Sequence, residues 1–271
     1  MATEALRHRA EEACLKGWPA LREKILDGWL LRFSGGHTRR ANSVNPLVAG
    51  SEPLADKIGR CERLYEEAGL PTIFRIPSMA EPGLDASLDA RGYGPAEDET
   101  RVIYVDFARH PPRDDDDAYV LHAPSAEWFE AHAHCSGSSA QAQQEQRDIL
   151  HALAVPAVFT GLRGDDGRLG ALAFGAVHDR ILCLNLVVTD PALRRRGLSR
   201  RVVSSVLHWA RERAEAEGAC LPVVATNTPA IALTSVSGSR PSSIATTIGA
   251  AQRSDAESGR PAQIAKEGAS A

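Results

Sequence analysis

One stretch of this chain, residues 182–199, constrains its fold most, because it combines a buried strand, a basic loop and a helix start. The apolar run 182–188 predicts a strand, and the residues after Gly197 keep the apolar spacing of a long helix. Between them lie three consecutive arginines. A helix N-terminus flanked by arginines favours a phosphate group, because backbone N–H groups and guanidinium groups both donate hydrogen bonds to it.

The spacing Arg194-x-x-Gly197-x-Ser199 follows Pro191 by three residues and resembles the acyl-CoA pyrophosphate loop of the GNAT N-acetyltransferases. The family pattern is Arg/Gln-x-x-Gly-x-Gly/Ala, placed between the fourth strand and the third helix of the fold. Ser199 departs from this pattern at the last small position, but serine is small enough to keep a close helix approach. The residues alone also allow a basic turn before an amphipathic helix.

Bulk composition restricts the class of protein. The chain has 271 residues, 43% of them hydrophobic and 24% charged, which is ordinary for a globular protein large enough for two domains. A net charge of −4 argues against a nucleic-acid partner. Five scattered cysteines, no signal peptide and no apolar run of membrane-spanning length lead us to expect a cytoplasmic protein with no membrane partner.

Two units are predicted, residues 1–110 and 118–233, joined by a linker over 111–117 that carries two prolines and four aspartates. The second unit predicts a strand, two helices, antiparallel strands at 155–162, 169–177 and 181–188, the loop, a helix ending at Gly218, a strand and a further helix. The resemblance implies this order. It therefore implies an α/β (α+β) GNAT fold, with a mixed, mostly antiparallel sheet flanked by helices.

The first unit echoes the end of such a domain, with a helix ending at Gly69 and a short helix running into Arg91-Gly92-Tyr93 before a strand over 101–107. It lacks an Arg-x-x-Gly loop after Pro46. We therefore expect a tandem protein with a degenerate N-terminal GNAT-like half, resembling bacterial GNAT proteins with Gly-Trp-Leu-Leu-Arg and Arg-Arg-Ala-Asn-Ser-Val segments. An unrelated α/β cap stays open as an alternative.

Residues 234–271 change character, being rich in Ser, Ala, Thr, Gly and Arg without any aromatic residue, and we expect a disordered tail. The genetic code indicates an out-of-frame tail. Restoring one base before the codon of Thr234 allows residues 234–251 to encode YERLGFATVVDRYHYRRG, in which the last two bases of each codon are nearly fixed by the observed residues. This string carries the Tyr-x-x-Leu-Gly-Phe ending of a GNAT helix. A natural low-complexity tail is the alternative.

The resemblance implies an acyl-CoA-dependent N-acyltransferase. It would transfer acetyl from acetyl-CoA to a primary amine of a small molecule or protein by direct attack in a ternary complex. Cofactor contacts carried over by motif are the strand backbone at Leu186, Val187 and Val188, the loop Arg194, Arg195, Arg196, Gly197, Leu198 and Ser199, and Asn227. A backbone N–H at Val187 or Val188 could stabilise the oxyanion. Asn227 suits a helix cap equally well.

Catalytic residues stay unassigned. The family tyrosine that acts as general acid is expected where Thr234 stands, and a threonine has too high a pKa for that role. The strand 181–188 carries no glutamate that could act as base, although Asn185 is a candidate for ordering a water. Alternatives are a non-catalytic acyl-CoA-binding or interaction protein, a variant inactivated by loss of its native C-terminus, and nucleotide binding unrelated to CoA.

We expect no metal site. His132-x-His134-Cys135 carries metal-ligand types, but this spacing points the side chains to different faces of a helix, so we expect a solvated helix end here. For the assembly we expect a monomer or a homodimer.

Overall fold

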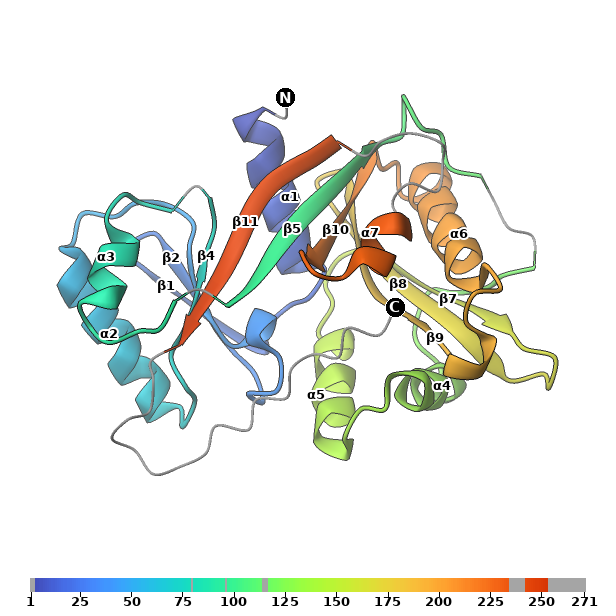
Figure 1. Ribbon diagram of the computed structural model, residues 1–271, viewed down its shortest axis with the longest axis horizontal. Helices are drawn as coiled ribbons and strands as arrows, with labels where there is room; N and C mark the ends of the chain where they lie inside the picture. Colours follow the sequence, from blue (N-terminus) through green and yellow to red (C-terminus); the bar gives the residue numbers. More distant parts are fainter. Residues whose placement is uncertain (1–2, 79, 96, 114–116, 234–241, 253–271) are drawn as a thin grey trace. The chain divides into compact units, whose positions relative to one another are not determined.

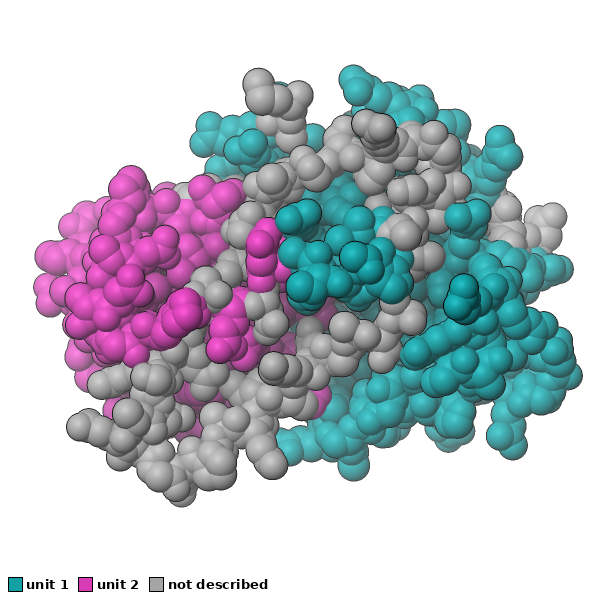
Figure 2. All heavy atoms as spheres, in the orientation of Figure 1, with its two compact units in different colours: residues 1–19, 101–245, 268–271 teal, residues 20–100, 246–267 magenta. Residues whose placement is uncertain are grey.

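The computed structural model describes residues 3–78, 80–95, 97–113, 117–233 and 242–252 (Figure 1). The chain forms two compact units (Figure 2). Unit 1 comprises residues 1–19, 101–245 and 268–271, and unit 2 comprises residues 20–100 and 246–267. Each unit is therefore assembled from separate segments, whereas the sequence led us to expect contiguous ones. Among the described residues, no helix combines the length and apolar character needed to cross a bilayer.

Unit 1 holds a mixed sheet with the strand order β5-β10-β9-β8-β7-β6. Strands β6 to β9 pair antiparallel, and β10 pairs parallel with β9. The turn between β8 and β9 is a tight hairpin in which Asp179 and Arg180 both have positive φ, as a two-residue type I′ turn requires. The elements of this unit are α1 (Glu4–Lys16), β5 (Glu97–Asp106, which enters the unit at Arg101), β6 (Tyr119–Leu121), α4 (Ala126–Ser136), α5 (Ala140–His151), β7 (Ala157–Arg163), β8 (Leu169–His178), β9 (Ile181–Thr189), η2 (Pro191–Leu193), α6 (Leu198–Arg213), β10 (Gly218–Val224) and α7 (Thr228–Leu233).

Helices pack on both faces of this sheet. Helix α6 packs Val202 and Val206 against alternate residues of β7, β8 and β9 such as Ala173 and Leu182. The intervening residues point to the opposite face, since side chains alternate along a strand. On that face Trp128 of α4 makes an edge-to-face contact with Phe159. The ring of Phe159 in turn stacks on that of Phe174, with the two ring centroids 4.7 Å apart. Both faces of the central strand β9 are therefore buried, which explains its nearly continuous apolar sequence.

Unit 2 contains strands in the order β1-β2-β3-β4-β11. Its elements are β1 (Arg22–Leu26), β2 (Trp29–Phe33), η1 (Arg39–Ala41), β3 (Val44–Pro46), α2 (Leu54–Glu67), β4 (Ile73–Ile76), α3 (Leu84–Asp89), the first residues of β5 and most of β11 (Ser242–Gln252). Helix α2 ends at Glu67, and Gly69, just after its cap residue Ala68, has a φ of 68°, the left-handed conformation that glycine adopts at no steric cost.

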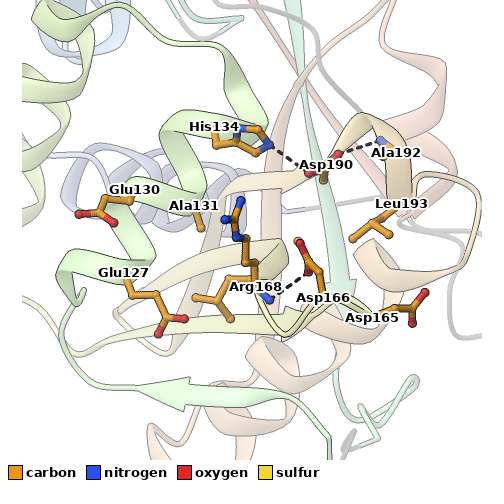
Figure 3. A pocket seen from close by; sticks show the side chains of 12 residues that line it. Glu127, Glu130, Ala131, His134, Asp165, Asp166, Arg168, Asp190, Ala192 and Leu193 are labelled. Carbon is orange, nitrogen blue, oxygen red and sulfur yellow. Dashed lines mark hydrogen bonds and ion pairs between the residues drawn. The ribbon is translucent and has the colours of Figure 1, made fainter.

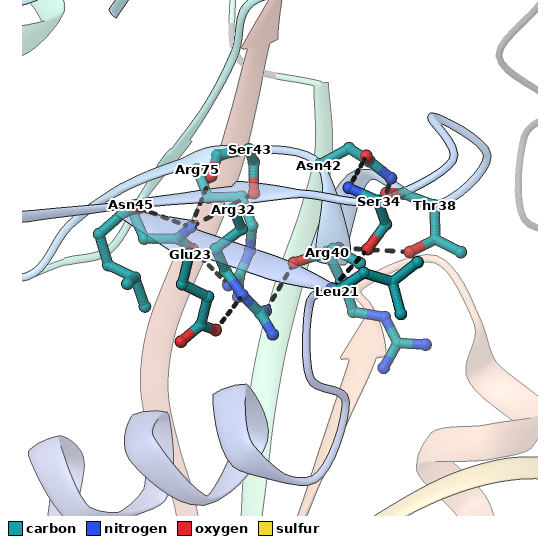
Figure 4. A network of polar contacts seen from close by, with 12 residues as sticks. Leu21, Glu23, Arg32, Ser34, Thr38, Arg40, Asn42, Ser43, Asn45 and Arg75 are labelled. Carbon is teal, nitrogen blue, oxygen red and sulfur yellow. Dashed lines mark hydrogen bonds and ion pairs between the residues drawn. The ribbon is translucent and has the colours of Figure 1, made fainter. Parts of the chain in front are cut away.

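Unit 2 buries several charged groups (Figure 4). The guanidinium group of Arg32 is 1% exposed, lies 3.2 Å from a carboxylate oxygen of Glu23 and donates to the carbonyl oxygen of Arg40 at 2.7 Å. Burial lowers the pKa of Arg32 to about 10. Arg39 pairs with Glu97 at 3.3 Å. These contacts assign the arginines of this segment to the folding of unit 2.

Three sequence expectations need correction, and the first concerns Gly218. Helix α6 ends at Arg213, and Gly218 instead begins β10. A Cβ atom at this position would collide with the Tyr104 side chain and would lie 2.6 Å from the backbone oxygen of Val105. Glycine is needed here because β5 approaches β10 closely, so it marks a strand contact and not a helix end.

The expected disordered tail is also wrong in part, because residues 242–252 form strand β11, which pairs antiparallel with β4 from Gly249 to Gln252. The segment carries isoleucines and threonines, residue types that favour strands. Residues 234–241 and 253–271 lie outside the described part of the chain, and the out-of-frame origin of the tail stays a prediction.

The third correction concerns His132, which is buried in unit 1 and is not at a solvated helix end. Its ring stacks on Trp128 with a 5.3 Å centroid separation, and its Nδ1 lies 3.2 Å from the side-chain nitrogen of Gln146. Because an amide nitrogen only donates, Nδ1 accepts, and the ring is neutral. Burial lowers the pKa of His132 to about 4.

This buried imidazole predicts acid sensitivity. The folded pKa of about 4 lies below the unfolded value of about 6.5, so the unfolded state binds the extra proton and stability falls as pH drops through this window. His132→Phe, which keeps a ring on Trp128, is expected to remove on the order of 3 kcal/mol of this pH dependence. Urea unfolding between pH 6.5 and pH 4 measures it. The exposed His8 gives a matched control, and equal slopes for His8→Phe and His132→Phe would refute the assignment.

Candidate functional site

The central feature of unit 1 is the parting of its two parallel strands. Strands β9 and β10 pair only where Ile181–Cys183 faces Gly218–Cys220. Beyond this short ladder β9 continues to Thr189 and β10 to Val224. Past Cys183, the backbone edge of β9 that faces away from β8 is therefore not paired with β10. An extended ligand could form hydrogen bonds with this edge as a strand would.

Strand β9 carries a β-bulge in the segment that no longer pairs with β10. Phe174 faces Asn185 and Leu172 faces Val188, so the single residue between them on β8 opposes both Leu186 and Val187. Leu186 has a φ of 50°, which is costly for a leucine. Leu186 and Val187 are the two residues of β9 that are only partly buried. Bulges of this kind redirect backbone groups and are frequent next to active sites.

Past the bulge, the arginine-containing loop over residues 190–197 connects β9 to α6. Asp190 begins it by capping the short helix η2, since its carboxylate accepts the N–H of Ala192 at 2.8 Å. Arg195 and Gly197 have φ values of 63° and 78°. Gly197 is the N-cap of α6 and carries no side chain to cap it, and a Cβ atom added there would meet nothing within 4 Å. The N-cap residue of this sixteen-residue helix thus makes no side-chain hydrogen bond to the first N–H groups, and an uncapped helix N-terminus favours a bound phosphate.

Ser199, the departure from the family pattern, has a structural partner. Its hydroxyl group lies 2.6 Å from that of Thr189 at the end of β9. The bond ties the first turn of α6 to the strand that carries the bulge. Thr189 was missed at the level of sequence, because a threonine at the end of a strand is common and only its distance from Ser199 gives it a role.

We expect this hydroxyl pair to contribute measurably to stability. Ser199→Ala and Thr189→Val, combined in a double-mutant cycle, should show a coupling free energy of about 1 kcal/mol, the usual net value of a hydrogen bond between neutral groups. Urea unfolding of the two single variants and the double variant provides the measurement. Strictly additive effects would show that the two hydroxyl groups do not stabilise each other.

The three arginines of the loop have different surroundings. Arg194 donates from Nε to the carbonyl oxygen of Thr189 at 3.4 Å, and Arg195 is exposed. Arg196 pairs with Asp165 of the β7–β8 turn at 3.1 Å, and this hydrogen bond and charge lower the pKa of Asp165. The pair is solvent-exposed and is therefore weak, so the Arg196 side chain can exchange Asp165 for another anion.

Beside this loop lies a pocket of about 600 Å³ between α4 and the β7–β8 turn (Figure 3). Its wall includes Asp190, whose second carboxylate oxygen lies 3.2 Å from Nε2 of His134. The charged residues lining the pocket are Glu127, Glu130, His134, Asp165, Asp166, Arg168 and Asp190. Carboxylates dominate this list and would repel a diphosphate. The pocket is therefore distinct from the anion-binding geometry at the start of α6, and no sequence motif predicted it.

Other expected site residues have structural partners of their own. Asn227 accepts the N–H of Ala230 through its side-chain oxygen at 3.1 Å, so its role as a helix cap is confirmed. Asn185 is buried, and its amide donates toward the oxygen and the sulfur of Cys183, each at 3.4 Å. Thr234 lies outside the described residues. A contact between Asn227 and a cofactor stays a prediction.

A bulged central strand, a parallel neighbour that leaves it and a glycine-started helix are features of the GNAT fold, and the chain belongs to the GNAT-family N-acetyltransferases. The chain belongs to the family described as "Probable histone acetyltransferase Rv0428c C-terminal", whose profile matches residues 3–239. Solved GNAT structures share the fold of this chain, so the α/β GNAT fold predicted from the sequence is confirmed.

Individual relatives agree with this family. The chain is 26% identical over 228 residues to the "Uncharacterized N-acetyltransferase YobR" of Bacillus subtilis (strain 168), covering 83% of this chain and 91% of the relative. A GCN5-related N-acetyltransferase from Kribbella flavida shares the fold, with a TM-score of 0.62 and 14% identity over 93% of this chain and 96% of that one. A tandem GNAT protein from the clavulanic acid biosynthesis pathway matches with a TM-score of 0.59 and 15% identity, covering 78% of this chain and 75% of that protein.

Proposed function

We propose that this protein transfers an acetyl group from acetyl-CoA to a primary amine of a small molecule or a protein, by direct attack in a ternary complex. The observation that carries the proposal is the bulge at Leu186 in the strand that leads to the glycine-started helix α6. The bulged strand offers backbone hydrogen bonds for a pantetheine arm, and the start of α6 offers N–H donors for a diphosphate.

The parts of the site would divide the cofactor between them. The backbone of Leu186, Val187 and Val188 would pair with the pantetheine arm, and the N–H groups at the start of α6 would hold the diphosphate. Residues assigned to the diphosphate are Arg194, Arg195, Arg196, Gly197, Leu198 and Ser199, with Asn227 as a further contact. Held in this way, the thioester carbonyl lies near the bulge, where an N–H of Val187 or Val188 can stabilise the oxyanion.

The reaction then follows from the thioester's position. The neutral amine nitrogen attacks the carbonyl carbon, the carbon–sulfur bond breaks, and the CoA thiolate leaves. The amine gives up one proton and the thiolate takes one up, so the products are an N-acetyl amide and free CoA. Positioning the two reactants can contribute on the order of 7–11 kcal/mol to lowering the barrier. Acetyl-CoA serves as co-substrate, and we assign no metal to this step and no nucleic acid as acceptor. We propose that the protein acts as a monomer or a homodimer.

A second candidate function is acyl-CoA binding without catalysis. It is favoured by the threonine at position 234, where the family's acidic tyrosine is expected. In that case the bulge and the α6 N-terminus would bind the cofactor, and the thioester would remain intact.

Calorimetry and product analysis separate the two functions. The full chain is titrated with acetyl-CoA and with CoA, and then incubated with acetyl-CoA and a panel of polyamines, amino acids and lysine peptides. Mass spectrometry of the amines, with free CoA measured by chromatography, reports turnover. An acetylated amine supports the transferase, and binding without CoA release supports the second candidate. No heat of association with either compound would overturn both.

A further inference from the structure

Three of the five cysteines meet at one place in unit 1. Cys14 comes from α1, Cys183 from β9 and Cys220 from β10, and all three are buried. Their sulfur atoms all lie within 4.8 Å of one another, and those of Cys14 and Cys220 are 3.6 Å apart. Neither the cofactor geometry nor the acetyl transfer uses these side chains.

The local structure explains why the three sulfurs converge. Cys183 and Cys220 are direct partners in the last pair of the β9–β10 ladder, so their side chains point to the same face of the sheet. Helix α1 ends at Gly17, where an added Cβ atom would lie 3.0 Å from Cβ of Cys183. This glycine allows the last turn of α1 to approach β9, which brings Cys14 over the two strand cysteines.

The dimensions fit three thiolates around one soft ion. A metal–sulfur distance of about 2.3 Å in a trigonal arrangement places the sulfurs about 4.0 Å apart. Within the described part of the chain, the cluster contains sulfur ligands and neither carboxylate nor imidazole. Zinc prefers four ligands, whereas thiolate sulfur is also the ligand that selects Cu(I). A three-sulfur cluster therefore favours a cuprous ion.

The surroundings add a polar contact of the kind that supports metal–thiolate bonds. The side-chain amide of Asn185 donates to the sulfur of Cys183 at 3.4 Å. Such second-layer donors orient a ligand and stabilise its negative charge. A disulfide would use only two of the sulfurs and would leave the third unexplained.

We propose that Cys14, Cys183 and Cys220 form a binding site for a cuprous ion, coordinated by three sulfurs. Binding joins α1, β9 and β10 at the last pair of the ladder, just before the two strands part. The site is independent of acetyl transfer, so its test does not depend on turnover.

The test uses the reduced full chain under anaerobic conditions. Cu(I) is supplied as its complex with bicinchoninate, and the loss of that chelator's colour reports transfer to the protein. We expect one equivalent to be taken up, and X-ray absorption of the complex should show three sulfur neighbours at about 2.3 Å. Cys14→Ala, Cys183→Ala and Cys220→Ala should each lower Cu(I) affinity by about 100-fold or more, because each removes a ligand, and loss of an outer-layer partner alone costs roughly 10- to 100-fold.

Cys135→Ala is the matched control, because Cys135 is also a buried cysteine of unit 1 but lies outside the cluster. It should bind Cu(I) as the parent protein does. If circular dichroism shows that a cluster variant does not fold, the number of sulfur neighbours in the X-ray absorption spectrum of the parent protein tests the proposal without that variant. Copper left on the chelator, unchanged affinity in all three cluster variants, or nitrogen or oxygen neighbours in the spectrum would overturn the proposal. Zn(II) held at the cluster with a fourth ligand in preference to Cu(I) would do so as well.

Discussion

Gly197→Val is expected to weaken acetyl-CoA binding by about 100-fold while the protein stays folded. Two effects add. A β-branched residue at a φ of 78° costs roughly 1–2 kcal/mol, and a side chain at this position fills the open space in front of the α6 N-terminus. Because 1.4 kcal/mol corresponds to a factor of ten, steric exclusion and strain in the loop together produce a loss that calorimetry resolves easily.

Gly137 provides the control for backbone strain. It ends helix α4 with a φ of 65°, and an added Cβ atom there also meets nothing within 4 Å. Gly137→Val should therefore lower the melting temperature about as much as Gly197→Val, with the affinity for acetyl-CoA unchanged. If both variants bind the cofactor as the parent protein does, the start of α6 is not the diphosphate site.

Thr234→Tyr is expected to raise the rate of acetyl transfer, by on the order of 10² in kcat. A phenol has a pKa low enough to protonate the departing CoA thiolate, and a positioned general acid contributes typically 10² to 10⁴ in rate. The prediction rests on the family pattern, since position 234 lies outside the described residues. A version of the gene with the restored reading frame after codon 233 should give a larger gain, because it supplies the whole YERLGF segment.

Thr234→Phe is the matched control for this gain. It has the same ring and lacks the hydroxyl group, so it should not raise kcat, and its KM for acetyl-CoA should equal that of Thr234→Tyr. Single-turnover rates with a saturating amine make the comparison. Equal rates in the two variants would show that the ring, and not the proton, changed the chemistry, and sequencing the gene around codon 234 tests the reading frame directly.

Much of the second half of the fold follows from short-range rules. The start of helix α4 at Ala126 is one case, because the hydroxyl group of Ser125, a typical helix-capping residue, accepts the N–H of Trp128 at 3.1 Å. The predicted strand over 181–188 is present as β9 (Ile181–Thr189), since an apolar run of this short length bounded by turn residues is typical of a buried strand. Local signals of this kind depend on neighbouring residues, which a sequence displays directly.

Features that depend on distant neighbours were not predictable. A glycine after an amphipathic stretch, as at Gly218, is typical of a helix end. Only the close approach of Tyr104, from a strand over one hundred residues earlier, shows why this residue is glycine. The hydroxyl pair of Thr189 and Ser199 depends on how tightly α6 returns to β9. The cluster of three cysteines requires the register of two strands and the end of a helix at once. The cofactor contacts themselves stay predictions.

The unfavourable backbone conformation of Leu186 has a consequence for engineering. Conformational strain at one position lowers the heat resistance of the whole domain, so random mutagenesis under thermal selection should favour substitutions there that relax the strand to a regular conformation. Variants recovered in that way would survive higher temperatures and lose the irregularity that we propose for binding acetyl-CoA. Robustness and acetyl transfer would then compete at this residue.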